Sequence, residues 1–278
     1  MAGKLYVVGT PIGNLSDMSP RAVEVLKMVD FVAAEDTRVT LKLFNHFGIK
    51  NNLISYYEHN RTEKGEWIVS KILAGENCAI VTDAGMPCIS DPGEDLVALC
   101  RQHGVNTEVV PGPTAAMSAI AVSGLASGRF CFEGFLSTTK KNRYEHLEEI
   151  KNETRTMIFY EAPHKLRNTL SDFLKYFGSE RKISLCRELT KIHEQVLVMT
   201  LSEANEYYEN NEPRGEYVLV LEGASPEIKE MSLDECLELM LEMTRSGKSK
   251  NDAAKLVAKQ SGYRKNELYK LLVNEGAE

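Results

Sequence analysis

The sequence predicts an α/β protein with two successive domains, a mostly parallel sheet and then a mixed sheet, followed by a small helical domain. Residues 1–124 alternate short β-branched runs with helical patterns, which is typical of crossover connections in a parallel sheet. Residues 129–224 are richer in strands, with about three helices between them. Residues 232–278 carry helical patterns without a strand signal. A length of 278 residues also exceeds one ordinary domain.

In the first domain, short apolar runs predict four strands, and Leu53–Ser55 is also strand-like. Ser19 and Pro20 are typical of a helix start, and the apolar positions after them follow helical spacing. A second helix is predicted to begin with Asp91 as its N-cap and Pro92 as its first residue. The four strands are Leu5–Val8, Phe31–Ala34, Ala79–Thr82 and Thr107–Val110.

In the second domain the same reasoning predicts five strands, and the small residues of Ser123–Gly128 are expected to join the two domains. In the last domain, Ser232–Glu235 resembles a capping box, and helices are predicted over 249–260 and 264–273 on either side of a glycine turn. The five strands are Phe130–Leu136, Met157–Tyr160, Ile183–Arg187, Gln195–Met199 and Tyr217–Leu221.

Composition excludes several classes of protein. No apolar run approaches the roughly 20 residues that cross a bilayer, and the N-terminus lacks a signal peptide, so we expect a cytoplasmic protein with no membrane partner. The six cysteines form no C-x-x-C pair and are expected to be reduced, and the six histidines lack the spacing of metal ligands. A net charge of −7 argues against a generic binder of naked nucleic acid, but not against an RNA enzyme with a local basic patch.

Three loops rich in glycine and proline follow predicted strands: Gly9–Asn14, Thr82–Gly93 and Pro111–Ala115. The first is not the G-x-G-x-x-G of a dinucleotide site. Each loop taken singly is typical of a tight turn. Because the carboxyl ends of parallel strands meet at one edge of a sheet, the three loops together predict one ligand cleft, in which glycine lets the backbone approach the ligand closely.

These loops and Met157–His164 resemble the signature segments of the tetrapyrrole-methylase-like superfamily of S-adenosylmethionine-dependent methyltransferases. The resemblance spans residues 4–222 and is strongest to the branch that methylates a cytidine 2′-hydroxyl in small-subunit ribosomal RNA. The segments that carry it are GTPIGNLSDMSPRA, AAEDTR, SYYEHN, DAGMPCISDPG, PGPTA, YEAPHK and RELTKIHE.

The resemblance implies a two-domain tetrapyrrole-methylase-like fold that holds S-adenosylmethionine in the cleft between the domains, largely through backbone contacts. From the second domain, Glu161 or its neighbour Ala162 is expected to line the same pocket. Relatives in this superfamily are commonly homodimers, and a homodimer is expected here. The positions of the first domain that match the cofactor site are Ile12, Ala84, Gly85, Met86, Ile89, Thr114 and Ala115.

Methyl transfer from a sulfonium is an in-line displacement, so alignment of the oxygen with the methyl carbon is the main task. A ribose hydroxyl must also lose its proton, and charged groups at strand ends are candidates for this. For the charged residues that follow the second predicted strand, Glu35, Asp36 and Arg38, the alternative to a catalytic role is a helix cap or a salt bridge. His164 and His193 are not chosen, because lone histidines are more often structural. The candidates are Glu35, Asp36 and Arg38 in the first domain, and Arg187, Glu188 and Lys191 in the second.

Two further features concern RNA. Tyr56, Tyr57 and His59 could stack on a flipped-out nucleotide, although tyrosines that pack a loop would look identical in sequence. Residues 245–270 hold eight Lys and Arg against two acidic residues, a local charge of +6. Their helices resemble a helix-turn-helix unit that contacts RNA phosphates, and the alternative is a solvated helical face. The acidic total favours an assembled small subunit over naked RNA as the substrate.

Two other functions stay open. The same two-domain cleft supports C-methylation of a corrin-like tetrapyrrole in related proteins, and fold alone does not decide function. A non-enzymatic regulator with a helix-turn-helix tail is the alternative from another class. The basic tail and the AAEDTR and RELTK segments favour RNA over a tetrapyrrole, and this preference depends on the resemblance.

Overall fold

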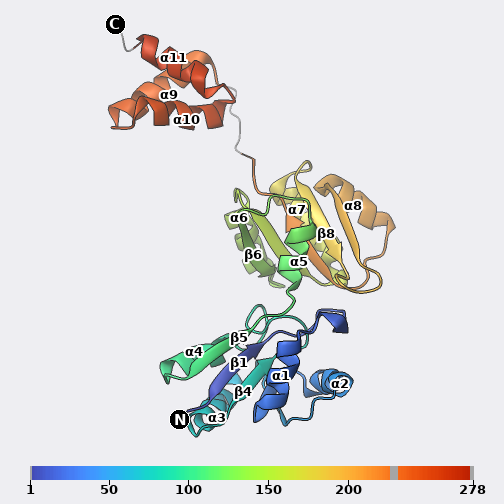
Figure 1. Cartoon of the computed structure of the whole chain (residues 1–278). Coiled ribbons are helices and arrows are strands. Elements are labelled where there is room, and N and C mark those ends of the chain that lie inside the picture. Colours follow the sequence, from blue (N-terminus) through green and yellow to red (C-terminus); the bar gives the residue numbers. More distant parts are fainter. Residues whose placement is uncertain (1, 226–230, 276–278) are drawn as a thin grey trace. The chain divides into compact units, whose positions relative to one another are not determined.

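A computed structural model describes residues 2–225 and 231–275 (Figure 1). The chain folds into two compact units, Met1–Gly223 and Ala224–Glu278. Both predicted sheets belong to the first unit. Within the described residues, no helix is at once long and apolar enough to cross a membrane. The predicted boundary between the two sheet domains, at residues 124–129, falls inside the first unit. The division into two units therefore does not test it, and it remains a prediction.

The first sheet has five parallel strands in the order β3-β2-β4-β1-β5, as the alternation of strands and helices predicts. β1 lies between β4 and β5, so the loops that follow these three strands emerge side by side. The strands are β1 (Lys4–Val8), β2 (Phe31–Ala34), β3 (Leu53–Ser55), β4 (Cys78–Val81) and β5 (Asn106–Val110).

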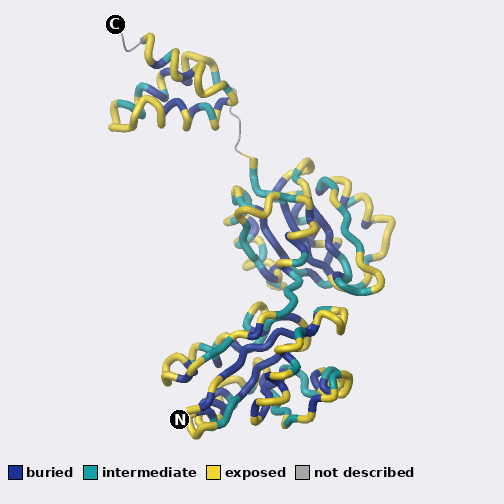
Figure 2. The backbone as a smooth tube through the Cα atoms, in the orientation of Figure 1, coloured by how far each residue is buried: buried dark blue, intermediate teal, exposed yellow. Residues whose placement is uncertain are grey.

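Helices cover both faces of this sheet, because successive strand side chains point to opposite sides. Tyr6 and Val8 pack with α1 and α2, whereas Leu5 and Val7 pack with α3 and α4. Figure 2 shows the strands as the most buried part of the unit. The helices are a short 3₁₀ turn η1 (Leu15–Asp17), α1 (Pro20–Met28), α2 (Thr37–Phe47), α3 (Arg61–Leu73) and α4 (Glu94–Gln102).

One predicted helix start is confirmed and one is wrong. Ser19 caps α1, because its side chain accepts a hydrogen bond from the Ala22 backbone N–H, and Pro20 is the first helical residue. The second helix does not begin at Asp91 and Pro92. α4 begins two residues later than predicted, at Glu94, with Gly93 as its N-cap at a φ of +131°. Asp91 is thereby left in the loop.

The second sheet is mixed, as predicted, with the order β6-β7-β10-β8-β9. β6 and β7 are parallel, and the remaining neighbours are antiparallel. All five predicted strands are confirmed to within one residue at each end. They are β6 (Phe130–Phe135), β7 (Thr156–Glu161), β8 (Lys182–Arg187), β9 (Gln195–Thr200) and β10 (Tyr217–Leu221).

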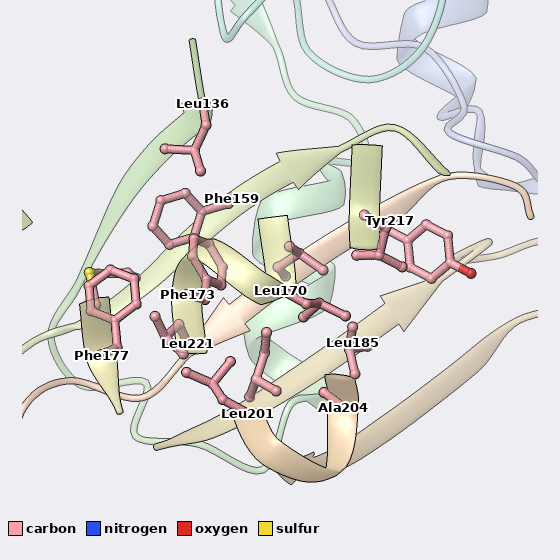
Figure 3. Packing of buried hydrophobic residues seen from close by; sticks show 14 of the residues in the cluster. Leu136, Phe159, Leu170, Phe173, Phe177, Leu185, Leu201, Ala204, Tyr217 and Leu221 are labelled. Atoms are coloured by element: carbon pink, nitrogen blue, oxygen red, sulfur yellow. The ribbon is translucent and has the colours of Figure 1, made fainter. Parts of the chain in front are cut away.

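Four helices pack on the second sheet. Three lie on one face, where Phe159, Phe173 and Phe177 form a continuous aromatic core (Figure 3). The fourth, α5, begins directly after the first sheet and packs on the opposite face, against Ile158 and Val220. α5 therefore couples the first sheet to the second. The helices are α5 (Ala115–Val122), α6 (Lys140–Ile150), α7 (Pro163–Phe177) and α8 (Leu201–Asn210).

Over its described residues 231–275, the second unit is a three-helix bundle with its own core around Met240, Val257 and Leu268. The predicted capping box is confirmed: Ser232 and Glu235 exchange both of its hydrogen bonds. Gly262 ends the second helix in the left-handed conformation. The helices are α9 (Leu233–Arg245), α10 (Lys250–Ser261) and α11 (Lys265–Glu275).

Candidate active site

The three small-residue loops meet at the carboxyl ends of β1, β4 and β5. Thr10 and Gly85 exchange two backbone hydrogen bonds, with N···O distances of 2.9 and 3.1 Å. A Cβ on Gly9 would lie 2.7 Å from the Cα of Gly112, so only glycine lets these two loops approach this closely. Gly85 has a φ of +88°, which side chains rarely adopt. The loops are thus a packed, preformed surface rather than three separate turns.

A cavity of about 550 Å³ opens over this surface and is closed on its other side by the second sheet. Its volume lies within the roughly 300–1,000 Å³ of small-molecule sites. The structure brings together all nine positions that the resemblance assigns to the cofactor, since each of them lines the cavity: Ile12, Ala84, Gly85, Met86, Ile89, Thr114, Ala115, Glu161 and Ala162.

Glu161, at the end of β7, is fixed in the wall of this cavity. Its side chain is almost fully buried and accepts hydrogen bonds from the Ala162 backbone N–H, at 2.8 Å, and from the Thr169 hydroxyl. A buried carboxylate with both oxygens bonded is held in one orientation. Glu161 is therefore a rigid acceptor in the wall rather than a mobile charge.

Sequence reasoning missed the other half of the cavity wall. Tyr160, Cys186, Leu189, Tyr217 and Val218 line it from the second sheet. The sequence pattern predicts strands β7, β8 and β10, but not which face of their sheet meets a ligand. Only the packing of the second sheet against the three loops identifies this face.

Asp91 also lines the cavity, although its sequence context favours a helix cap. Partial burial, together with the nearby carboxylates of Glu35 and Asp83, raises the pKa of Asp91 to about 6. Glu35 accepts a hydrogen bond of 2.6 Å from the Thr82 hydroxyl, which fixes it at the adjoining ends of β2 and β4. Acidic groups with raised pKa values in a cleft are typical of functional sites.

The first candidate catalytic set, Glu35, Asp36 and Arg38, does not form one cluster in the structure. Asp36 caps α2 by accepting from the Arg38 backbone N–H at 2.8 Å, and it also pairs with the Arg38 guanidinium at 2.6 Å. The side-chain hydrogen bond from Arg38 lowers the pKa of Asp36 to about 2. This geometry fits the capping alternative. Glu35, Asp36 and Arg38 do not line the cofactor cavity; of the three, Glu35 is the one whose charge acts on Asp91.

The second set forms a connected cluster. Lys191 donates hydrogen bonds of 2.9 Å to both Glu188 and Glu216. Partial burial opposes the charged form of Lys191, but these two carboxylates outweigh it and raise its pKa. Lys191 is therefore an ammonium at neutral pH and cannot accept a proton. Arg187 points elsewhere, since its Nε donates to the carbonyl of Arg214 at 2.7 Å.

This cluster is held by strained backbone. Glu188 and Thr190 have φ values of +51° and +66°, and Gly215 leaves space for Glu188, because a Cβ there would lie 2.6 Å from its carboxylate. Non-glycine residues with positive φ gather at functional sites. Lys191 and Glu216 line a second cavity of about 370 Å³. Ile12, Ala84 and Glu216 line both cavities, so the two adjoin.

The predicted aromatic stack is wrong for Tyr56. Its ring is buried, and its hydroxyl donates to Asp95 at 2.8 Å, so it packs the loop instead. Tyr57 is 42% exposed and lies edge-on to His59, with ring centroids 6.2 Å apart. Stacking by these two residues stays a prediction.

Comparison with known proteins places this geometry among methyltransferases. Residues 4–205 match the model of the tetrapyrrole (corrin/porphyrin) methylases. A ribosomal RNA small subunit methyltransferase I from Synechocystis is 46% identical over 270 residues, which cover 97% of both chains. The protein of that name from Escherichia coli O157:H7 is 42% identical over 275 residues, covering 98% of this chain and 96% of the relative.

Solved structures of methyltransferases share the fold. Uroporphyrin-III C-methyltransferase from Thermus thermophilus, complexed with S-adenyl homocysteine, has a TM-score of 0.57 at 20% identity, covering 79% of this chain and 97% of that one. The methyltransferase CobJ has a TM-score of 0.60 at 18% identity, covering 81% and 95%. At these identities the likeness concerns the fold, which is the predicted two-sheet α/β architecture.

Proposed function

Because the chain belongs to the tetrapyrrole (corrin/porphyrin) methylase family, and within it to the proteins named ribosomal RNA small subunit methyltransferase I, we propose that it transfers a methyl group from S-adenosylmethionine to small-subunit ribosomal RNA. The acceptor is the ribose 2′-oxygen of a cytidine. One observation carries the assignment of the site: nine positions at the strand ends of two separate sheets surround one cavity of about 550 Å³.

The cavity suits this methyl donor. Ala84, Gly85, Thr114 and Ala115 have small side chains, so their backbone N–H and C=O groups are accessible to a bound molecule. Apolar side chains such as Met86 complete the wall. S-adenosylmethionine, when bound, supplies an electrophilic methyl group on a sulfonium. The chain's task is then to align the ribose oxygen and to exclude water, and neither requires a covalent intermediate.

Loss of the ribose proton is assigned to Asp91. It lines the cavity, and a pKa of about 6 leaves it ionised, yet still able to take up a proton, near neutral pH. Glu35 acts through Asp91, because its negative charge favours the protonated form. Lys191, held as an ammonium between Glu188 and Glu216, orients the RNA in the adjoining cavity instead of accepting a proton. Asp36, Arg38 and Arg187 support these loops.

The RNA partner is the small ribosomal subunit in assembled form, and the enzyme acts as a homodimer in the cytoplasm. The basic side chains of residues 245–270 supply attraction to phosphate that the acidic total of −7 does not. Lys255 and Lys259 on α10 are exposed, as are Lys265 and Lys270 on α11. Their sequence-independent charge suits phosphate contacts rather than base readout.

The direct test is transfer of a labelled methyl group from S-adenosylmethionine to small subunits purified from a strain that lacks this gene. We expect the label in RNA, on the ribose of one cytidine, with assembled subunits as better substrates than naked RNA. Absence of label from RNA, with the protein folded and the cofactor bound, would contradict the function. Transfer of label to a corrin-like tetrapyrrole instead would favour the other branch of the family.

A further inference from the structure

A second polar cavity lies on the helical side of the second sheet, between the start of α6 and the first turns of α7. It has a volume of about 480 Å³ and is separate from both cavities described above. We call it the basic pocket. The lining residues on which the inference depends are Ser137, Lys140, Arg143, Lys165, Asn168 and Asp172.

The basic pocket carries a net positive charge on an acidic protein. Arg143 pairs with Asp172 at 2.6 Å, and both side chains are largely buried, at 12% and 19% exposure. The opposite charges of Arg143 and Asp172 cancel, so this pair adds no net charge to the pocket. Lys140 and Lys165 form no salt bridge with any described residue. Two lysines without a salt-bridged carboxylate among the described residues therefore line the pocket, together with the hydroxyl and amide side chains of Ser137 and Asn168.

The arginine is held in place for a further hydrogen bond. Its Nε donates to Asp172 and its Nη2 donates to the Thr169 hydroxyl at 2.9 Å. No hydrogen-bond acceptor among the described residues contacts its Nη1. A guanidinium fixed by a carboxylate, beside two free ammonium groups, presents cationic donors that match a phosphate.

The basic pocket adjoins the cofactor cavity along three connections. Leu136 in the pocket wall follows Phe135, which lines the cofactor cavity, and Lys165 follows His164, which lines it as well. The third connection is a chain of hydrogen bonds, because Thr169 accepts from Arg143 and donates to Glu161. One hydrogen bond, from the Thr169 hydroxyl to Glu161, thus joins the wall of the pocket directly to the wall of the proposed methylation site.

We propose that the basic pocket binds a backbone phosphodiester of the RNA substrate beside the nucleotide that enters the cofactor cavity. This inference rests on the proposed function, since it names where that RNA is held. An RNA chain brings a phosphate at every nucleotide, so a phosphate site next to the reacting ribose fixes the register of the strand. Positioning of this kind is what an in-line methyl transfer requires.

The test compares the double variant Lys140→Ala, Lys165→Ala with the single variant Lys141→Ala. Lys141 is the neighbour of Lys140 on α6, but it does not line the pocket and lies 3.9 Å from Glu145, its partner. Binding to small subunits is measured at several salt concentrations without methyl transfer, together with cofactor affinity and melting temperature. The Lys→Arg versions at positions 140 and 165 serve as charge-retaining controls.

We expect the double alanine variant to bind small subunits roughly ten-fold more weakly, and its salt dependence to fall by about 0.7–0.9 per lysine in the log–log slope. Cofactor affinity and melting temperature should stay unchanged, Lys141→Ala should resemble wild type, and the arginine versions should restore binding. Equal affinities for the double variant and Lys141→Ala would overturn the proposal.

Inorganic phosphate serves as a second probe of the same chemistry. A variant that loses affinity for inorganic phosphate but retains affinity for small subunits would assign the pocket to free anions and overturn the proposal. Because these readouts are binding constants, they are separate from turnover. Wild-type protein that binds small subunits through the pocket but transfers no methyl group would contradict the proposed function and leave the pocket assignment intact.

Discussion

The carboxyl group of Asp91 has a raised pKa, of about 6, in the proposed site. It faces a cavity whose walls are mostly apolar, and the carboxylates of Glu35 and Asp83 lie near it. Burial and like charge both disfavour its ionised form. Glu35 is fixed in turn by the Thr82 hydroxyl at 2.6 Å. The two acids therefore form a pair in which one tunes the other.

Replacement of Asp91 by Asn should lower kcat by roughly 10²–10⁴-fold, the usual contribution of a proton acceptor, and leave cofactor affinity nearly unchanged. Glu35→Gln removes a charge that raises the pKa of Asp91, so the acid limb of the kcat profile should move from near pH 6 to lower pH. The measurement is kcat against pH for wild type and both variants. Wild-type kcat in Asp91→Asn would contradict the role of Asp91.

Asp91→Asn should also stabilise the protein, by an amount that depends on pH. The pKa of Asp91 is about 6 in the folded state, and an unfolded Asp has a pKa of about 3.9. The folded state thus binds the proton more tightly, and the group costs stability as pH rises from 4 to 6. We expect Asp91→Asn to be more stable than wild type at pH 8 by about 1 kcal/mol, discounted for partial exposure, and equal at pH 4. Thermal unfolding at both pH values tests this.

Gly85→Leu should abolish cofactor binding, because the side chain would enter the cavity where the loop approaches the ligand. Its φ of +88° adds backbone strain of about 1–2 kcal/mol. Gly104→Leu is the matched control, since Gly104 has a φ of +69° and no atom within 4 Å of its Cβ position. Calorimetry should show lost affinity in the first variant only. Equal cofactor affinities in both would remove Gly85 from the site.

At the scale of elements, the loop after β8 packs against the loop after β1. A Cβ on Gly13 would lie 2.5 Å from the Cγ of Lys191 and 2.8 Å from the Oγ1 of Thr190. This contact joins the two sheets on one side of the site, and α5 joins them through its packing on the second sheet. The cavity therefore depends on how the elements of two sheets fit together.

Lys191→Met should leave Glu188 and Glu216 close together without their shared cation. We expect a stability loss of about 1 kcal/mol, because partly exposed ion pairs contribute little, and a larger loss in kcat/KM for small subunits, about ten-fold or more. Arg214→Met is the control, since it removes an exposed pair with Glu212 at 2.9 Å. If both variants have the same kcat/KM, the Lys191 cluster is a structural feature only.

At the scale of the whole molecule, the first unit, Met1–Gly223, contains all three cavities discussed above, whereas the unit Ala224–Glu278 has its own core. The family match over residues 4–205 also falls within the first unit. Catalysis and cofactor binding are thus expected to need only the first unit. The three-helix unit is expected to add affinity for RNA through its basic side chains.

Truncation after Gly223 should therefore leave cofactor affinity and the melting transition of the first unit unchanged. Binding to small subunits should weaken roughly ten-fold or more, and its salt dependence should become shallower, because phosphate contacts are lost. A full-length variant with Lys255 and Lys259 changed to Ala should show part of this effect. A truncated protein that binds small subunits like wild type would contradict a role of the three-helix unit in RNA binding.

The local elements of this protein follow from its sequence alone. The strands of both sheets, the Ser19 cap and the capping box of Ser232 and Glu235 depend on side-chain alternation and on bonds between residues three positions apart. Such interactions are the same in any tertiary context, so a pattern in the sequence predicts them. The small-residue loops likewise predict a ligand cleft, because parallel strands end at a common edge.

Only the tertiary structure decided which further side chains join the nine predicted cofactor positions in the site. Asp91 lies in the cavity rather than at a helix start, Tyr56 packs a loop instead of offering its ring to a nucleotide, and α5 covers the second sheet. Each outcome depends on residues far apart in the chain: Thr10 meets Gly85 across 75 positions, and Tyr56 meets Asp95 across 39. Burial and pKa are set by these long-range contacts, and neither composition nor spacing in the sequence specifies them.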